Sequence, residues 1–124
     1  MESDAESWEM LANSWLLAQE LERALEPLAK AAQLAERGDG YVRLGQVHLE
    51  REEWRQAAAA LATGLEKGDL DDPGGVNLLL GIAFYHQNQL ARARKHFGAA
   101  RSSESSEKSA RQWLELMDQE SKRG

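Results

Sequence analysis

The chain has 124 residues and a formal net charge of −6, with 42% hydrophobic and 29% charged residues, which is typical of one soluble domain. Cysteine is absent, which excludes disulfides, thiolate zinc sites and cysteine nucleophiles. The acidic balance argues against a general nucleic-acid binder, because phosphate contacts need clustered cations. No apolar run approaches the roughly 18 residues of a membrane helix, and the acidic segment 1–7 lacks the apolar core of a signal peptide.

Helix-forming residues dominate the chain, and three glycine- or serine-rich breaks divide it. The breaks lie at residues 38–40, 68–75 and 102–106, and a softer break divides each long stretch in two. The predicted helices are, in chain order, roughly 5–18, 21–36, 40–51, 54–67, 74–87, 90–102 and 106–120. No stretch alternates apolar and polar residues for long, so no strand is predicted.

Two aspartates are placed to begin helices. Asp72 followed by Pro73 is typical of an N-cap with proline in the first helical turn. Asp39 is predicted to cap the helix that begins near residue 40 in the same way. Pro27 lies just past the first turn of its predicted helix, where it removes one early hydrogen bond, so we expect a mild kink at most.

One pattern of large and small side chains occurs three times, at offsets of 33 and 36 residues. Such a period predicts an array of stacked helix-turn-helix units, with repeats at about 5–38, 39–73 and 74–105. The small residue in the third slot lets the two helices of a pair approach closely. The slots are filled by Trp8, Leu11, Ala12, Trp15, Ala24, Leu28 and Ala31, then by Tyr41, Leu44, Gly45, His48, Ala57, Leu61 and Gly64, and then by Asn77, Leu80, Gly81, Phe84, Ala93, Phe97 and Ala100.

These slots resemble the tetratricopeptide repeat, whose signature is W-x-x-L-G-x-x-Y followed by A-x-x-x-F. The resemblance covers about residues 5–107 and implies an all-α, right-handed α-solenoid that serves as a protein-interaction module. The chain departs from the signature at His48 and Asn77, in the missing terminal prolines, and in a longer connection after the second repeat. Such departures are common in this family.

The end of the chain resembles the opening of a fourth repeat. Trp113-x-x-Leu116 lies 36 residues after Asn77-x-x-Leu80, with Met117 in the glycine slot. A small residue is not needed there, because no partner helix crosses this one. The sequence therefore predicts a capping helix over about 106–120 that closes the array.

In tetratricopeptide arrays the first helices of successive repeats line a concave face. Carried onto this sequence, the resemblance implies a partner-binding groove formed by Asn13, Leu17, Val42, Arg43, Gln46, Glu50, Leu78, Ile82, Tyr85 and His86. The predicted helix 74–87 is apolar nearly all round, and such helices are normally buried on more than one side. Two alternatives stay open for Leu78, Ile82 and Tyr85: the capping helix covers them through Trp113 or Met117, or they form an apolar patch for a partner segment.

Two subfamilies can be compared residue by residue. Repeats that grip the C-terminal carboxylate of heat-shock chaperones use lysines, an arginine and asparagines; Asn13 matches, but Glu9, Arg43, Gly75 and Leu79 do not, so that function is rejected. The run 44–49, the connector 67–74 and the ending Gln112-Trp113-Leu114 are similar to the C-terminal part of repeat proteins that accompany TonB-type systems in Gram-negative bacteria. This second resemblance implies a periplasmic fragment of a longer, exported protein.

The motifs of catalysis and metal binding are weak. Residues 40–45 resemble a phosphate loop, but Gln46 and Val47 replace the required Lys and Ser/Thr. Residues 69–72 suggest a calcium loop, but Pro73 and Leu80 stand in ligand positions, which favours a solvated acidic turn. The three histidines form no metal-binding pair, and His48 is interpreted as a hydrogen-bonded interior side chain. No cofactor, metal or catalytic residue is expected.

A basic cluster lies on the last paired helix, at Arg92, Arg94, Lys95, His96 and Arg101. It is interpreted either as a solvated outer face or as a contact for an acidic partner, including the acidic end of another copy. Residues 1–40 carry nine acidic and three basic side chains, whereas residues 89–124 carry five acidic and eight basic ones. This polarity would suit head-to-tail contacts between copies.

The sequence thus predicts a protein–protein interaction scaffold that binds a partner peptide or helix on the concave face of the array. The alternative is a self-associating structural module that forms a homo-oligomer. Neither an enzyme, nor a nucleic-acid binder, nor a membrane-inserted protein is expected. The compartment stays open: periplasmic if the chain is a fragment of an exported parent, and cytoplasmic otherwise.

Overall fold

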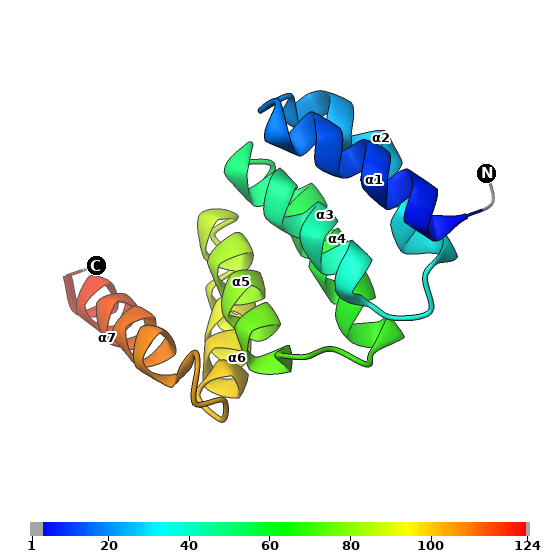
Figure 1. The fold of residues 1–124 in the computed structure, drawn as a ribbon. Helices are drawn as coiled ribbons and strands as arrows, with labels where there is room; N and C mark the ends of the chain where they lie inside the picture. The colour runs from blue at the N-terminus through cyan, green and yellow to red at the C-terminus, as the bar shows by residue number, and fades with distance from the viewer. Residues whose placement is uncertain (1–3, 124) are drawn as a thin grey trace. The chain divides into compact units, whose positions relative to one another are not determined.

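A computed structural model describes residues 4–123, which form seven α-helices and no strand (Figure 1). Within this described range no helix is long and apolar enough to cross a membrane. The chain divides into two compact units, residues 1–71 and 72–124, which are treated separately below. Unit 1 contains α1 (Ala5–Leu17), α2 (Leu21–Leu34), α3 (Asp39–Glu50) and α4 (Trp54–Lys67), and unit 2 contains α5 (Pro73–His86), α6 (Leu90–Ala100) and α7 (Glu107–Arg123).

The seven helices are those that the sequence predicts, with ends that differ by three residues or fewer. The Asp72 cap is confirmed: its carboxylate accepts a hydrogen bond from the Gly75 backbone N–H at 3.1 Å. The prediction that Asp39 caps this helix is wrong, because Gly38 is the N-cap and Asp39 is the first helical residue of α3. The Asp39 carboxylate instead forms an ion pair with Arg37 at 2.9 Å.

The turn within each helix pair has the same geometry in all three repeats. Gln19, Glu52 and Asn88 each have a positive φ, at 61°, 58° and 58°. The N–H of the next residue donates to the carbonyl five residues before it, at 2.9 Å in each turn, as in a Schellman helix end. Glycine usually takes this left-handed position because other L-residues pay a steric penalty there.

Replacing Glu52 by glycine is therefore expected to stabilise the protein by about 0.5–1 kcal/mol, since relief of the left-handed strain outweighs the flexibility added to the unfolded chain. Urea denaturation measures this change. Glu66→Gly, at an exposed position inside α4, is the matched control and should destabilise by about 1 kcal/mol. Destabilisation by both variants would contradict the strain argument.

Small residues sit where the helices of a pair cross, as the repeat pattern predicts. Ala12 in α1 is fully buried. A Cβ atom added to Gly45 in α3 would lie 2.6 Å from Cγ of Leu61 in α4. A Cβ atom added to Gly81 in α5 would lie 2.5 Å from two ring carbons of Phe97 in α6. The second and third helix pairs therefore leave no room for a side chain at this slot, and the first pair holds only the methyl group of Ala12 there.

The core of unit 2 joins all three of its helices. Ala93, Phe97 and Met117 are buried together, and Trp113 of α7 stacks on the Phe97 ring with centroids 5.4 Å apart. Ser106, which precedes α7, is also buried and donates to the Ala100 carbonyl at 2.8 Å. The helix α7 thus covers the end of the last helix pair, as the capping-helix prediction requires.

We expect Gly81→Ala to destabilise the protein by about 1–3 kcal/mol, because the added methyl group must displace the buried Phe97 ring. Gly98→Ala is the control, since nothing lies within 4 Å of the Cβ position at this exposed site in α6. That control should stabilise the helix by up to about 1 kcal/mol. Thermal melts of the two variants measure the difference, and equal melting temperatures would contradict the close-packing explanation.

Candidate functional site

One side of unit 1 is formed by α1 and α3, with α2 and α4 behind them (Figure 1). We call this side the α1/α3 face. Arg43 of α3 crosses it: one nitrogen of its guanidinium hydrogen-bonds to Oδ1 of Asn13, and another lies 3.7 Å from the carboxylate of Glu9. Arg43 therefore ties α3 to α1, and its side chain divides the α1/α3 face into two clefts.

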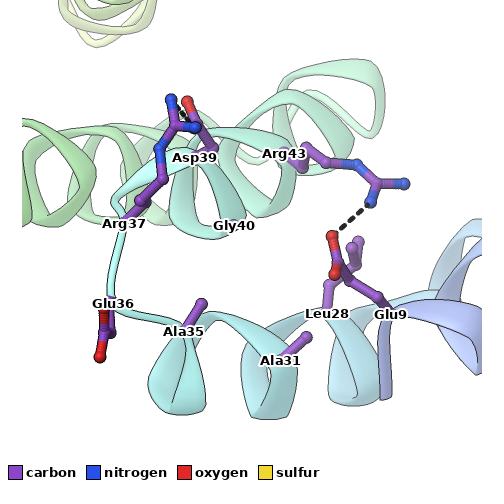
Figure 2. A pocket seen from close by; sticks show the side chains of 9 residues that line it. All are labelled: Glu9, Leu28, Ala31, Ala35, Glu36, Arg37, Asp39, Gly40 and Arg43. Carbon is purple, nitrogen blue, oxygen red and sulfur yellow. Dashed lines mark ion pairs between the residues drawn. The ribbon is translucent and has the colours of Figure 1, made fainter. Parts of the chain in front are cut away.

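The first cleft, with a volume of about 450 Å³, lies on the side of Arg43 toward the α2–α3 loop. Figure 2 shows Glu9 and Arg43 reaching toward each other at one end, and the Arg37–Asp39 pair on the other side. Its floor contains small side chains of α2, which leave the cleft open. The full lining is Glu9, Leu28, Ala31, Ala35, Glu36, Arg37, Asp39, Gly40 and Arg43.

The second cleft, of about 370 Å³, lies between the C-terminal halves of α1 and α3. Its lining combines apolar side chains with amide and carboxylate groups: Leu16, Gln19, Leu21, Arg43, Gln46, Val47 and Glu50. Three of the predicted groove residues, Arg43, Gln46 and Glu50, are thus brought together here. Arg43 belongs to the walls of both clefts.

The remaining predicted residues of unit 1 differ in exposure. Leu17 has 86% of its surface exposed, and the neighbouring Met10, which the sequence analysis did not single out, has 65%. Exposed side chains of this size are available for apolar contact. Val42 lies against α4 instead, since its Cγ2 would be 3.1 Å from a Cβ atom on Gly64.

The α2–α3 loop is held by an arginine that the sequence analysis did not single out. Arg37 hydrogen-bonds to the Asp71 carboxylate at 2.8 Å and to the Asp69 carbonyl at 2.9 Å, and it pairs with Asp39. The hydrogen bond to Asp71, followed by the charge of Asp39, raises the pKa of Arg37. A guanidinium therefore lies among the carboxylates that suggested a calcium loop, and no metal-binding cluster occurs among residues 4–123.

His48 has the role that the sequence predicts. Its Nδ1 lies 2.8 Å from Glu53 Oε1, and only 15% of its side chain is exposed. Hydrogen bonds from Arg51 and then from His48 lower the pKa of Glu53. These contacts join the end of α3 to the start of α4, so they stabilise the turn.

In unit 2 the predicted groove residues lie beside the capping helix. Leu78, Ile82 and Tyr85 are partly buried against the cluster that contains Met117. The Tyr85 ring meets Trp113 edge-on at 5.1 Å. Its hydroxyl lies 2.8 Å from both carboxylate oxygens of Glu120, which raises the pKa of Tyr85. The capping helix therefore packs beside Leu78, Ile82 and Tyr85. His86, at the end of α5, is exposed.

Three of the five side chains of the basic cluster contact other residues of their own unit. Arg94 pairs with Asp118 at 2.8 Å, and Arg92 lies over the Phe84 ring at 5.6 Å. His96 Nδ1 contacts Asn77 Oδ1 at 2.8 Å, and its ring stacks on Phe84. Burial, followed by the nearby charges of Lys95 and Arg92, lowers the pKa of His96.

No family model and no curated protein sequence matches the chain, whereas solved structures match it closely. The peptide-binding tetratricopeptide-repeat protein YrrB is 25% identical, with a TM-score of 0.74 over 89% of this chain. The chain has the tetratricopeptide-repeat fold. It spans 56% of the YrrB chain.

Two further structures share this repeat fold. The TPR2B domain of yeast Sti1, solved in complex with pHsp70, is 17% identical and has a TM-score of 0.79 over 94% of this chain and 97% of its own. The first repeat domain of Spaghetti (RPAP3), bound to the HSP90 peptide SRMEEVD, is 12% identical with a TM-score of 0.80, over 96% of this chain and 94% of its own. At these identities the likeness shows the fold alone.

Because the pKa of His96 is lowered in the folded state, the unfolded chain binds more protons as the pH falls through the ordinary histidine value of about 6.5. The free energy of unfolding should therefore decrease between pH 7.5 and pH 5.5. His96→Gln, which keeps a hydrogen-bonding side chain, should decrease less over this interval. Urea midpoints at the two pH values measure the effect, and identical decreases in both proteins would show that His96 is not responsible.

Proposed function

We propose that the protein is an interaction scaffold whose α1/α3 face binds a segment of a partner protein. The observation that carries this proposal is the pair of clefts on one face, which share Arg43 as a wall. YrrB is described as having a peptide-binding site, and the RPAP3 domain was solved with a bound peptide, which supports the same use of the fold. Ligand sites are typically concave and combine apolar walls with a few polar groups that fix orientation.

The polar groups of this face suit the backbone of a bound segment. Asn13 uses Oδ1 for Arg43, so its amide N–H groups are directed to other acceptors, such as a peptide carbonyl. Gln46 is exposed and offers both a donor and an acceptor. Leu17 and Met10 add apolar contact beside them. In this proposal the exposed parts of Leu78, Ile82, Tyr85 and His86 form a second contact area beside α7.

The proposal is tested by panning a displayed library of random peptides against the protein and measuring the affinity of the selected sequences. Gln46→Ala should weaken their binding by roughly three- to tenfold, which corresponds to one lost hydrogen bond. Gln56→Ala, the same change at an exposed position of α4, should leave binding unchanged. Selected peptides that bind both variants equally would place the site elsewhere.

A homo-oligomer is the second candidate, and the distribution of charge favours it. Residues 1–71 carry fifteen acidic and seven basic side chains, whereas residues 72–124 carry six acidic and eight basic ones. Oppositely charged parts of two copies attract each other at low salt. Sedimentation velocity at micromolar concentration separates the candidates, since a monomer at low and high salt removes the oligomer.

A further inference from the structure

The charges of the two clefts differ in how far they are already neutralised. Together the clefts are lined by four carboxylates, Glu9, Glu36, Asp39 and Glu50, and by two guanidinium groups, Arg37 and Arg43. Which of these charges is available to a ligand depends on its partners within unit 1.

Both arginines are engaged. Arg37 lies within 4.0 Å of three carboxylates, those of Asp39, Asp69 and Asp71. Arg43 is held by Asn13 and Glu9 across the α1/α3 face. An acidic ligand would have to compete with these contacts for either guanidinium, and it would meet the surrounding carboxylates while doing so.

Two carboxylates remain without a counter-ion. Among residues 4–123, neither Glu36 nor Glu50 has an ion-pair partner, and both are exposed. Glu50 lines the second cleft together with Leu16 and Leu21, and Glu36 lies at the edge of the first. A cation entering either cleft would therefore find an unpaired carboxylate beside apolar surface.

Unit 1 as a whole adds to this preference. Its residues carry a formal charge of −8, the difference between seven basic and fifteen acidic side chains. A surface of one sign attracts ligands of the opposite sign and raises their association rate. Leu16 and Leu21, which line the second cleft together with Glu50, call for apolar side chains in the same ligand.

We propose, building on the function inferred above, that the α1/α3 face selects basic segments in which lysine or arginine alternates with large apolar residues. The apolar side chains pack on Leu16 and Leu21, and the cations pair with Glu50 and Glu36. This preference is opposite to the ligand of the similar RPAP3 domain, whose peptide SRMEEVD carries three acidic residues. The fold is shared with that domain, whereas the charge of the face is a property of this chain.

The test uses three fluorescein-labelled peptides of equal length: Gly-Lys-Leu repeated three times, the same peptide with Glu for Lys, and the same peptide with Ser for Leu. Fluorescence anisotropy at about 50 mM and about 300 mM salt gives the affinities. The Lys-Leu peptide should bind most tightly and weaken at high salt. The Lys-Ser peptide should bind roughly tenfold more weakly, because it loses the apolar contact.

Charge reversal separates the cleft from the charge of the whole protein. Glu50→Lys should weaken binding of the Lys-Leu peptide by roughly five- to tenfold, since one attraction becomes a repulsion. Glu66→Lys changes the net charge equally at an exposed position of α4 and should weaken binding by less than about twofold. Circular dichroism confirms that both variants are folded. Equal effects of the two reversals would overturn the proposal.

The outcomes also distinguish this inference from the function on which it rests. If the Glu-Leu peptide binds more tightly and its binding depends on Gln46, the partner class is wrong while the peptide-binding face stands. If no peptide, synthetic or selected, depends on Gln46, the proposed function itself is wrong. If sedimentation shows a dimer whose formation blocks the Lys-Leu peptide, a second copy is the occupant and the proposal is overturned.

Discussion

The close crossing of two helices, at a slot that holds only glycine or alanine, is the constraint on which each repeat depends. Gly45 faces Leu61 and Gly81 faces Phe97 at distances that a Cβ atom could not tolerate. Because the two backbones approach so closely, the larger side chains lie on either side of the crossing, in two stripes along each helix. One stripe packs against the partner helix, and the other is left for the α1/α3 face or for the capping helix.

The same constraint explains why the chain carries its charges where it does. The packing stripes are filled by alanine, leucine and aromatic residues, so charged residues occur on the outer surfaces and in the connections. In unit 1 many of these charges hold the structure together: Arg37 fixes the α2–α3 loop, and Arg43 spans two helices. The two arginines beside the clefts thus hold parts of unit 1 together, whereas Glu36 and Glu50 have no ion-pair partner among the described residues.

Unit 2 uses its surface differently. Its first helix is apolar on two sides, and α7 packs beside the second side through Trp113 and Met117. Leu78, Ile82 and Tyr85, which were predicted to line the groove, therefore pack against the cluster that contains Met117 of α7. The two units are built from the same repeat pattern. They offer different surfaces, because only the last repeat has a capping helix beside it.

The sequence by itself determined the repeat, the seven helices and the slots where they cross, because these follow from local periodicity and from residue size. The resemblance to the tetratricopeptide repeat, in turn, implied that Asn13, Arg43, Gln46 and Glu50 share one face. Only the tertiary structure decided which of these groups are already engaged. Arg37 meets Asp69 and Asp71 across more than 30 positions, Val42 turns toward Gly64, and Asp39 pairs with Arg37 instead of capping α3. Such choices depend on distances between helices, which no local pattern encodes.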